Sequence, residues 1–242
     1  MPNSAFFRGD IPFNSFSQTH IFTILFSLAL LISLIIAGRR LSQSQNLFIG
    51  RCIAVFLSLT VIIFMALHMH FDRFDSSVDL PLSICNLFAF LAPLLFWNPN
   101  SKRFEVIYFA VMSGTFQAII TPDLYVGFPT YGFFKYWICH VGLVILVIHY
   151  LLSFQLRPRA KGILITFAWL NIYLLAIIPI NLLLDANYFY LMKKPINPSI
   201  LDLFGPWPTY LLVSEVLAMA FFTVAYLPVI WINRYDKKQT AN

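Results

Sequence analysis

Seven apolar stretches, each about long enough to cross a lipid bilayer as a helix, occupy most of this 242-residue chain. The hydrocarbon core of a bilayer is about 30 Å thick, and a helix needs about 20 apolar residues to span it. The stretches cover residues 20–37, 52–69, 80–97, 104–120, 133–154, 162–184 and 209–232. Hydrophobic residues make up 60% of the chain and charged residues 11%, which excludes a soluble domain of this size. The sequence therefore predicts an all-α polytopic membrane protein, a seven-transmembrane-helix bundle.

The connections between these stretches are short. The longest, residues 185–208, holds about two dozen residues, which is too few for a separate folded domain. We therefore expect a single membrane domain over residues 1–242.

The loop charges predict the orientation of the chain. Eleven of the 16 Lys and Arg residues fall in alternate loops and in the C-terminal tail: Arg39, Arg40, Arg51, Lys102, Arg103, Arg157, Arg159, Lys161, Arg234, Lys237 and Lys238. The positive-inside rule places these loops in the cytoplasm, with the N-terminus outside and the C-terminus inside. Because membrane topology accounts for the net charge of +6, we expect no nucleic-acid partner.

Five polar residues on five different stretches lie near the predicted outer surface. They are Cys85, Gln117, His140, Asn181 and Glu215. At about 1.5 Å per residue, each lies within about 10 Å of the outer end of its helix. Polar side chains inside a membrane usually face a partner or a cavity, so the pattern predicts an outward-facing pocket.

The outer loops are aromatic and contain several Pro and Gly residues, which favours stiff segments able to cap such a pocket. Interfacial anchoring of aromatic residues explains the same composition. If the loops form a cap, we expect the substrate pocket to be lined by Gln117, Asp123, Asn181, Asn187, Tyr188, Tyr190 and Trp207.

Cys85 and His140 suggest nucleophilic chemistry. A histidine can take the proton of a thiol, and the resulting thiolate can attack an ester carbonyl. Glu215 could then orient His140, as the acidic member of a triad does. Each residue also has a plainer interpretation: Cys85 as a packing residue, His140 as a hydrogen-bonded structural histidine, and Glu215 as a cation or proton site in a transporter.

Metal and cofactor signals are weak. His68 and His70 lie 200° apart on a helix and would converge only in an extended segment, with Asp72 following. Interfacial histidines explain this run more simply. The chain has no Gly-rich phosphate loop, no H-E-x-x-H pair and no G-x-S-x-G elbow. We expect neither a metal nor a cofactor.

Several short runs, in consistent order, resemble the YwaF-like family of bacterial integral membrane proteins. The runs are residues 80–85, 114–118, 121–124, His140, 179–181, 187–191, 194–195 and 205–210. That family is distantly similar to an animal transmembrane family that transfers acyl chains between phospholipids with a membrane cysteine and a histidine. The animal cysteine aligns with Leu82, and Cys85 lies one helical turn later. The bacterial pattern often has His where this chain has Ser83. The resemblance implies a multi-pass protein of the bacterial plasma membrane, with His140 as a general base.

The leading prediction is an intramembrane lipid-acyl enzyme, either a thiol-based acyltransferase or a hydrolase acting on outer-leaflet lipids. Its catalytic residues would be Cys85, His140 and Glu215, and its partners membrane lipids. The alternative is a transporter or small-molecule-binding protein that uses His140 and Glu215. An assembly factor has fewer features in its favour, and the sequence leaves the oligomeric state open.

Overall fold

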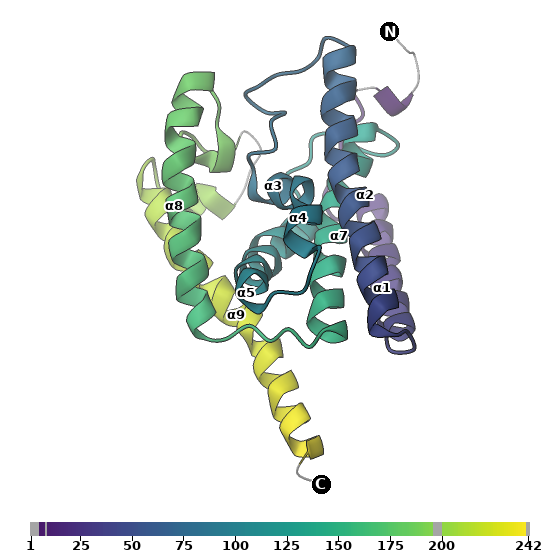
Figure 1. Cartoon of the computed structure of the whole chain (residues 1–242). Coiled ribbons are helices and arrows are strands. Elements are labelled where there is room, and N and C mark those ends of the chain that lie inside the picture. Colours follow the sequence, from purple (N-terminus) through teal and green to yellow (C-terminus); the bar gives the residue numbers. More distant parts are fainter. Residues whose placement is uncertain (1–4, 8, 196–199, 241–242) are drawn as a thin grey trace. The chain divides into compact units, whose positions relative to one another are not determined.

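The computed structural model describes residues 5–7, 9–195 and 200–240. The ends of the predicted domain, 1–4 and 241–242, lie outside the described residues. The described residues are helical or irregular, apart from one isolated antiparallel bridge between Pro12 and Val126. The all-α prediction is confirmed (Figure 1).

Five helices are long and apolar enough to cross a membrane. They are α1 (Gln18–Gly38), α2 (Gln43–His70), α7 (Tyr131–Ser153), α8 (Lys161–Leu184) and α9 (Thr209–Thr240), the last over Thr209–Tyr235. They correspond to five of the seven predicted stretches. α2 begins nine residues earlier than predicted, because Ser42 and Gln45 form a capping box there.

The other two predicted stretches are built from shorter pieces. Residues 80–97 contain α3 (Ile84–Phe90) and α4 (Ala92–Phe96), which meet at Leu91. Pro93 lies at the start of α4 and has no N–H for the carbonyl four residues earlier, which explains the interruption. The predicted stretch 104–120 is covered by α5 (Ser101–Ala110), a π-helical turn (Val111–Thr115) and α6 (Phe116–Ile120), which follow one another without a gap.

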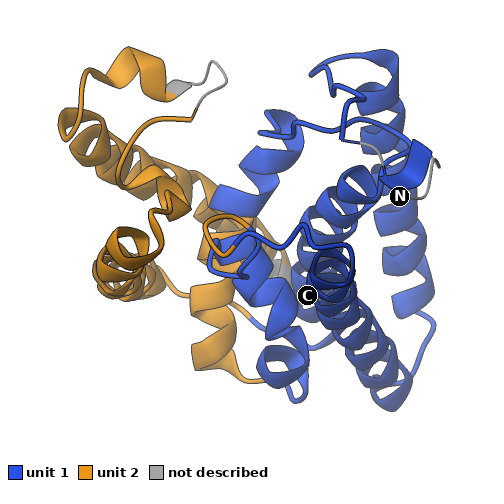
Figure 2. Ribbon diagram, turned by 90° about the horizontal axis from the view of Figure 1, so that it is seen from above, with its two compact units in different colours: residues 1–75, 79–99, 114–156 blue, residues 76–78, 100–113, 157–242 orange. Residues whose placement is uncertain are grey.

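The chain divides into two compact units, shown in blue and orange in Figure 2. Unit 1 comprises residues 1–75, 79–99 and 114–156, and unit 2 comprises residues 76–78, 100–113 and 157–242. The prediction of one membrane domain stays a prediction.

The core of unit 1 is built on α7, which packs against α2. Two glycines allow this close approach. A Cβ on Gly50 would lie 2.5 Å from the Tyr150 ring, and one on Gly142 would lie 2.5 Å from a Leu57 methyl group. Small residues at helix contacts are typical of membrane bundles, where close packing replaces the hydrophobic effect.

Unit 2 packs α5 against α8 and α9. The Tyr108 hydroxyl donates a 2.8 Å hydrogen bond to the Ala225 carbonyl, and the Phe109 ring contacts the rings of Phe222 and Tyr226. α8 ends at Leu184, and the capping residue Asp185 adopts a left-handed conformation with φ of 49°.

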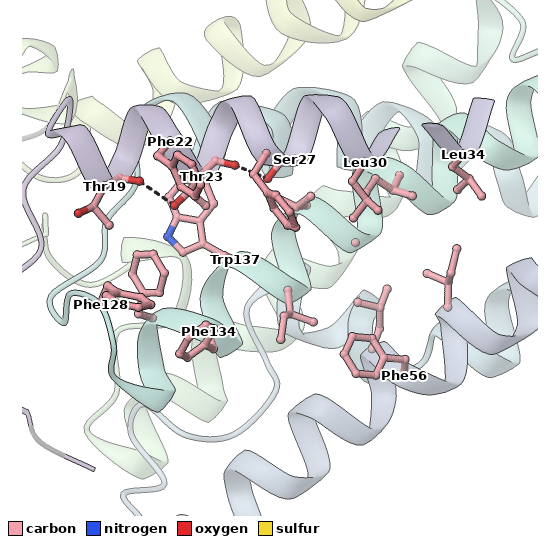
Figure 3. A pocket seen from close by; sticks show the side chains of 18 of the residues that line it. Thr19, Phe22, Thr23, Ser27, Leu30, Leu34, Phe56, Phe128, Phe134 and Trp137 are labelled. Atoms are coloured by element: carbon pink, nitrogen blue, oxygen red, sulfur yellow. Dashed lines mark hydrogen bonds between the residues drawn. The ribbon is translucent and has the colours of Figure 1, made fainter. Parts of the chain in front are cut away.

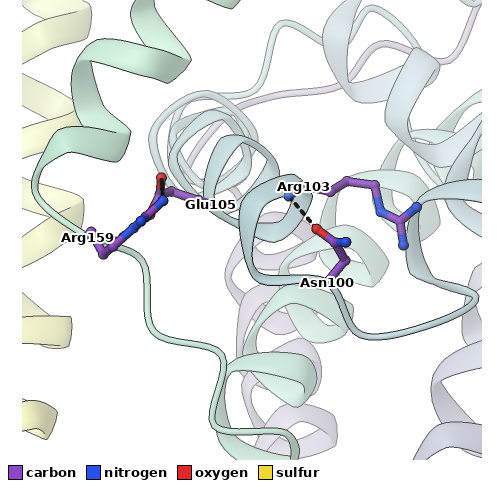
Figure 4. Close-up of polar contacts among 4 residues, drawn as sticks. All are labelled: Asn100, Arg103, Glu105 and Arg159. Atoms are coloured by element: carbon purple, nitrogen blue, oxygen red, sulfur yellow. Dashed lines mark hydrogen bonds and ion pairs between the residues drawn. The ribbon is translucent and has the colours of Figure 1, made fainter.

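A buried carboxylate ties α5 to the segment that leads into α8 (Figure 4). Glu105 is 2% exposed and accepts hydrogen bonds of 2.9, 2.9 and 3.0 Å from the backbone N–H, Nε and Nη2 of Arg159. Asn100 caps the start of α5, where its side chain accepts the Arg103 N–H at 3.0 Å. The charge of Glu105 is thus paired, as a buried carboxylate requires.

Candidate functional site

Cys85 lies in the first turn of α3 and is half-buried. Its Sγ is 3.2 Å from the hydroxyl oxygen of Thr115, which is fully buried in the π-helical turn. A structural packing cysteine needs no such partner. This contact gives the Cys85 sulfur a defined polar environment within unit 1.

Lys135 is a site residue that the sequence analysis did not single out. The Thr130 hydroxyl caps α7, so that helix begins at Tyr131 and Lys135 falls in its second turn. There the ammonium donates a 2.8 Å hydrogen bond to the side-chain oxygen of Asn86 and lies 4.8 Å from the centre of the Phe64 ring. Thr130 directly before an apolar run is the sequence signal for a helix that begins at Tyr131, two residues before the predicted stretch.

The Lys135 ammonium also interacts electrostatically with Asp79 and with the side chains of Cys85 and Cys139. Asn86 follows Cys85 directly in the chain, so this hydrogen bond ties Lys135 to the turn of α3 that carries the thiol.

His68 and Asp79 complete the polar part of unit 1. The Nδ1 of His68 is 2.9 Å from the Asp79 carboxylate, which also accepts the backbone N–H of Asp75 at 2.9 Å. The His68 ring packs on Phe64, the ring that Lys135 also contacts. Among the described residues, no three His, Cys, Asp or Glu side chains come together as metal ligands would.

His140 is buried on α7, and its hydrogen bonding defines its tautomer. Its Nδ1 is 2.7 Å from the Tyr136 carbonyl oxygen, and the two rings stack with centroids 4.0 Å apart. A carbonyl can only accept, so Nδ1 carries the proton and a neutral His140 has an unprotonated Nε2. This is the form that a general base requires.

Cys85 and His140 belong to the same unit, and α3 packs against α7. No hydrogen bond joins the two side chains in the part of the chain that the structure describes. A substrate group or a water molecule would therefore have to carry a proton between them.

Glu215 lies on α9 in unit 2 and accepts a 2.9 Å hydrogen bond from the side-chain amide of Asn171 on α8. The same amide nitrogen bonds the Phe167 carbonyl at 3.0 Å. Because His140 belongs to unit 1, the predicted orienting role of Glu215 stays a prediction.

The predicted pocket residues of unit 1 are half-exposed and bonded locally. Gln117 donates from its side-chain amide to the Thr121 hydroxyl at 3.0 Å, and Asp123 accepts a hydrogen bond from Tyr125. Neither contact reaches Cys85 or His140. Their substrate contacts stay a prediction.

The predicted pocket residues of unit 2 build the loop that follows α8. Asn181 is 1% exposed and pairs with the backbone of Tyr188 through bonds of 2.9 and 3.0 Å. Asn187 holds the backbone of Met192 and Lys193. The Trp207 indole donates to the Leu191 carbonyl at 3.0 Å, and the Tyr210 hydroxyl donates to the Tyr190 carbonyl. The polar groups of Asn181, Asn187 and Trp207 are thus engaged in loop structure.

Comparison with known proteins identifies the family to which this chain belongs. A family model for the TMEM164 family, a family of transmembrane proteins, matches residues 15–226. Searches of the curated proteins and of the solved structures found no match. The match covers most of the chain, including α1, α2, α7, α8 and the described site residues. This chain therefore belongs to the TMEM164 family and is a multi-pass membrane protein.

Proposed function

We propose that this protein is an intramembrane lipid-acyl enzyme, a thiol-based acyltransferase or hydrolase acting on outer-leaflet lipids. The observation that carries the proposal is the Cys85 thiol, held beside Thr115 and within electrostatic reach of the Lys135 ammonium. His140 on the neighbouring helix α7 supports it, because its Nε2 is left as a proton acceptor.

The reaction assigns one role to each group. His140 Nε2 accepts the Cys85 proton, and the thiolate attacks the ester carbonyl carbon of a lipid. The carbon–oxygen ester bond breaks as the carbon–sulfur bond forms, and the leaving oxygen receives the proton from His140. An alcohol or water then attacks the thioester and regenerates the thiol. Lys135 stabilises the thiolate, and Glu215 is proposed to orient His140.

We also propose a membrane topology for the protein. The segments at 80–97 and 104–120 would bring the number of spans to seven, with the N-terminus outside and the C-terminus in the cytoplasm. The basic loops support this orientation. The resemblance to the YwaF-like family supports a location in the bacterial plasma membrane.

The test is covalent labelling of the purified protein in lipid. A thiol-reactive lipid probe and an acyl-phosphonate lipid probe are each added, and adducts are located by mass spectrometry. We expect an adduct on Cys85 that is lost in Cys85→Ala and strongly reduced in His140→Phe. Cys52→Ala is the matched control, since Cys52 is exposed and has no role in the reaction. Lipid-acyl activity that survives Cys85→Ala would refute the thiol mechanism.

The alternative function is a transporter or binding protein that uses His140 and Glu215. The Glu215–Asn171 hydrogen bond favours it, because a carboxylate held by an amide between two membrane helices can bind a proton or cation. Glu215→Gln would then abolish uptake, whereas Cys85→Ala would leave uptake unchanged.

A further inference from the structure

The proposed reaction leaves one histidine–carboxylate pair of unit 1 without a role. The pair is His68, in the last turn of α2, and Asp79, whose carboxylate lies 2.9 Å from the Nδ1 of His68. Unit 1 also contains a cavity of about 930 Å³, lined mostly by α1, α2 and α7 (Figure 3). No His, Asp or Glu is among the described residues that line it, so the cavity itself supplies no base.

Hydrogen bonding defines the tautomer of His68. A carboxylate can only accept a hydrogen bond, so Nδ1 carries the proton and a neutral ring keeps a lone pair on Nε2. This Nε2 has no hydrogen-bond partner among the described residues. The His68 side chain is 30% exposed, whereas that of Asp79 is 7% exposed. The pair thus combines a buried carboxylate with a proton acceptor that a bound molecule can reach.

Neighbouring groups fix the orientation of the pair. The Asp79 carboxylate also accepts the backbone N–H of Asp75 at 2.9 Å, and the Asp79 N–H donates to the Asp75 carbonyl at 2.8 Å. The His68 ring packs on the Phe64 ring with centroids 4.1 Å apart, and Phe64 stacks on Tyr131 of α7. A carboxylate that orients an imidazole through Nδ1 is the arrangement by which catalytic triads hold their base.

Lys135 connects the pair to the turn that carries the thiol. Its ammonium lies 4.8 Å from the centre of the Phe64 ring, on which the imidazole packs, and donates to the Asn86 side chain at 2.8 Å. The same ammonium interacts electrostatically with Asp79 and with Cys85. The histidine–carboxylate pair and the thiol are therefore neighbours of one lysine within unit 1.

We infer that His68, oriented by Asp79, is the base that activates the acceptor hydroxyl, an alcohol or water, which attacks the thioester on Cys85. This role rests on the proposed thiol chemistry, in which His140 serves the first step. His140 is 8% exposed and its ring is stacked on Tyr136. The acceptor arrives after the first product has left, so it needs a base that is open to an incoming molecule, as His68 is.

The step balances in protons and electrons. The acceptor oxygen bonds to the thioester carbonyl carbon while His68 Nε2 takes the hydroxyl proton. The carbon–sulfur bond breaks with its electron pair on the Cys85 sulfur. The proton then passes from the imidazolium to the thiolate through water, and both groups return to their starting forms. An alcohol yields an ester and water yields a carboxylic acid. Asp79 is a positioning residue that keeps the imidazole in the required tautomer.

The test separates formation of the acyl-enzyme from its breakdown. The full-length protein in nanodiscs is mixed with p-nitrophenyl octanoate, with water or added glycerol as the acceptor. Acyl-enzyme on Cys85 is followed by acid quench and mass spectrometry. In His68→Gln we expect it to form at the wild-type rate and to break down at least about a hundredfold more slowly, the usual contribution of a general base. Glutamine keeps a donor for Asp79, so a structural hydrogen bond is retained.

Three controls exclude an indirect effect. Hydroxylamine attacks a thioester without a base, so it should discharge the acyl-enzyme equally fast in wild type and in His68→Gln. Asp79→Asn should slow breakdown at least about tenfold, since an amide can donate to Nδ1 and so move the imidazole proton to Nε2. His70→Gln is the matched variant, because His70 lies two residues later in α2 and its ring contacts Phe71. Its acyl-enzyme should break down at the wild-type rate.

The outcomes distinguish this inference from the proposed function. Wild-type breakdown in His68→Gln, or equal losses in formation and breakdown, would overturn the inference and leave the Cys85 chemistry intact. Slower discharge by hydroxylamine in that variant would also overturn it, because it would show a distorted site. No acyl-enzyme on Cys85 in the wild-type protein would refute the proposed function, and the inference with it. Thermal unfolding of each variant confirms folding.

Discussion

Gly162 near the start of α8 provides a quantitative test of the packing in unit 2. A Cβ at this position would lie 2.3 Å from Cγ and 2.5 Å from Cδ of Glu105, and 2.9 Å from the Phe109 ring. Ordinary contacts of a Cβ are 3.4–4 Å. Gly162→Ala therefore requires the Glu105 side chain to move by about 1 Å.

That movement would distort the three hydrogen bonds that the Glu105 carboxylate accepts from Arg159. Overpacking a well-packed site costs about 2 kcal/mol of unfolding free energy. For a chain of this size, the loss corresponds to a melting temperature lower by roughly 4–8 °C.

The assay is thermal unfolding in detergent micelles, combined with a double-mutant cycle. In a Glu105→Ala background the main clash is absent, so Gly162→Ala should cost about 1 kcal/mol or less. Gly114→Ala is the control, because nothing lies within 4 Å of its Cβ and alanine favours the helix. A Gly162→Ala protein as stable as wild type, or an equal loss in both backgrounds, would refute the reasoning.

Three further predictions concern the two units separately. Asn181→Leu should lower the unfolding free energy by about 2 kcal/mol, because it removes the two hydrogen bonds that the Asn181 amide makes with the Tyr188 backbone. Chemical denaturation measures this, and an unchanged midpoint would contradict it. Lys135→Met should slow alkylation of the Cys85 thiol several-fold by removing the nearby cation; a rate equal to wild type in quantitative labelling would exclude that role. Cys139, which is fully buried, should resist a small maleimide until the protein unfolds, and labelling of Cys139 in the folded state would show that the packing of α7 is wrong.

The amino-acid sequence by itself determined the class of this protein. Apolar runs of membrane-spanning length predict helices because the bilayer leaves no other partner for backbone polar groups, and the structure confirms five of them. The buried position of His140 could also be predicted, because a histidine within such a run has no water to bond.

Tertiary structure decided the partners of each polar side chain. The side chains of Thr115 and Cys85 meet although 30 residues separate them, and Asn86 contacts Lys135 across 49 residues. Helical periodicity specifies which face of a helix is polar, but not which face of another helix packs against it. Among the described residues the buried indole N–H of Trp137 has no acceptor, and the sequence cannot show this, because only the folded neighbours of a donor reveal that it has no acceptor.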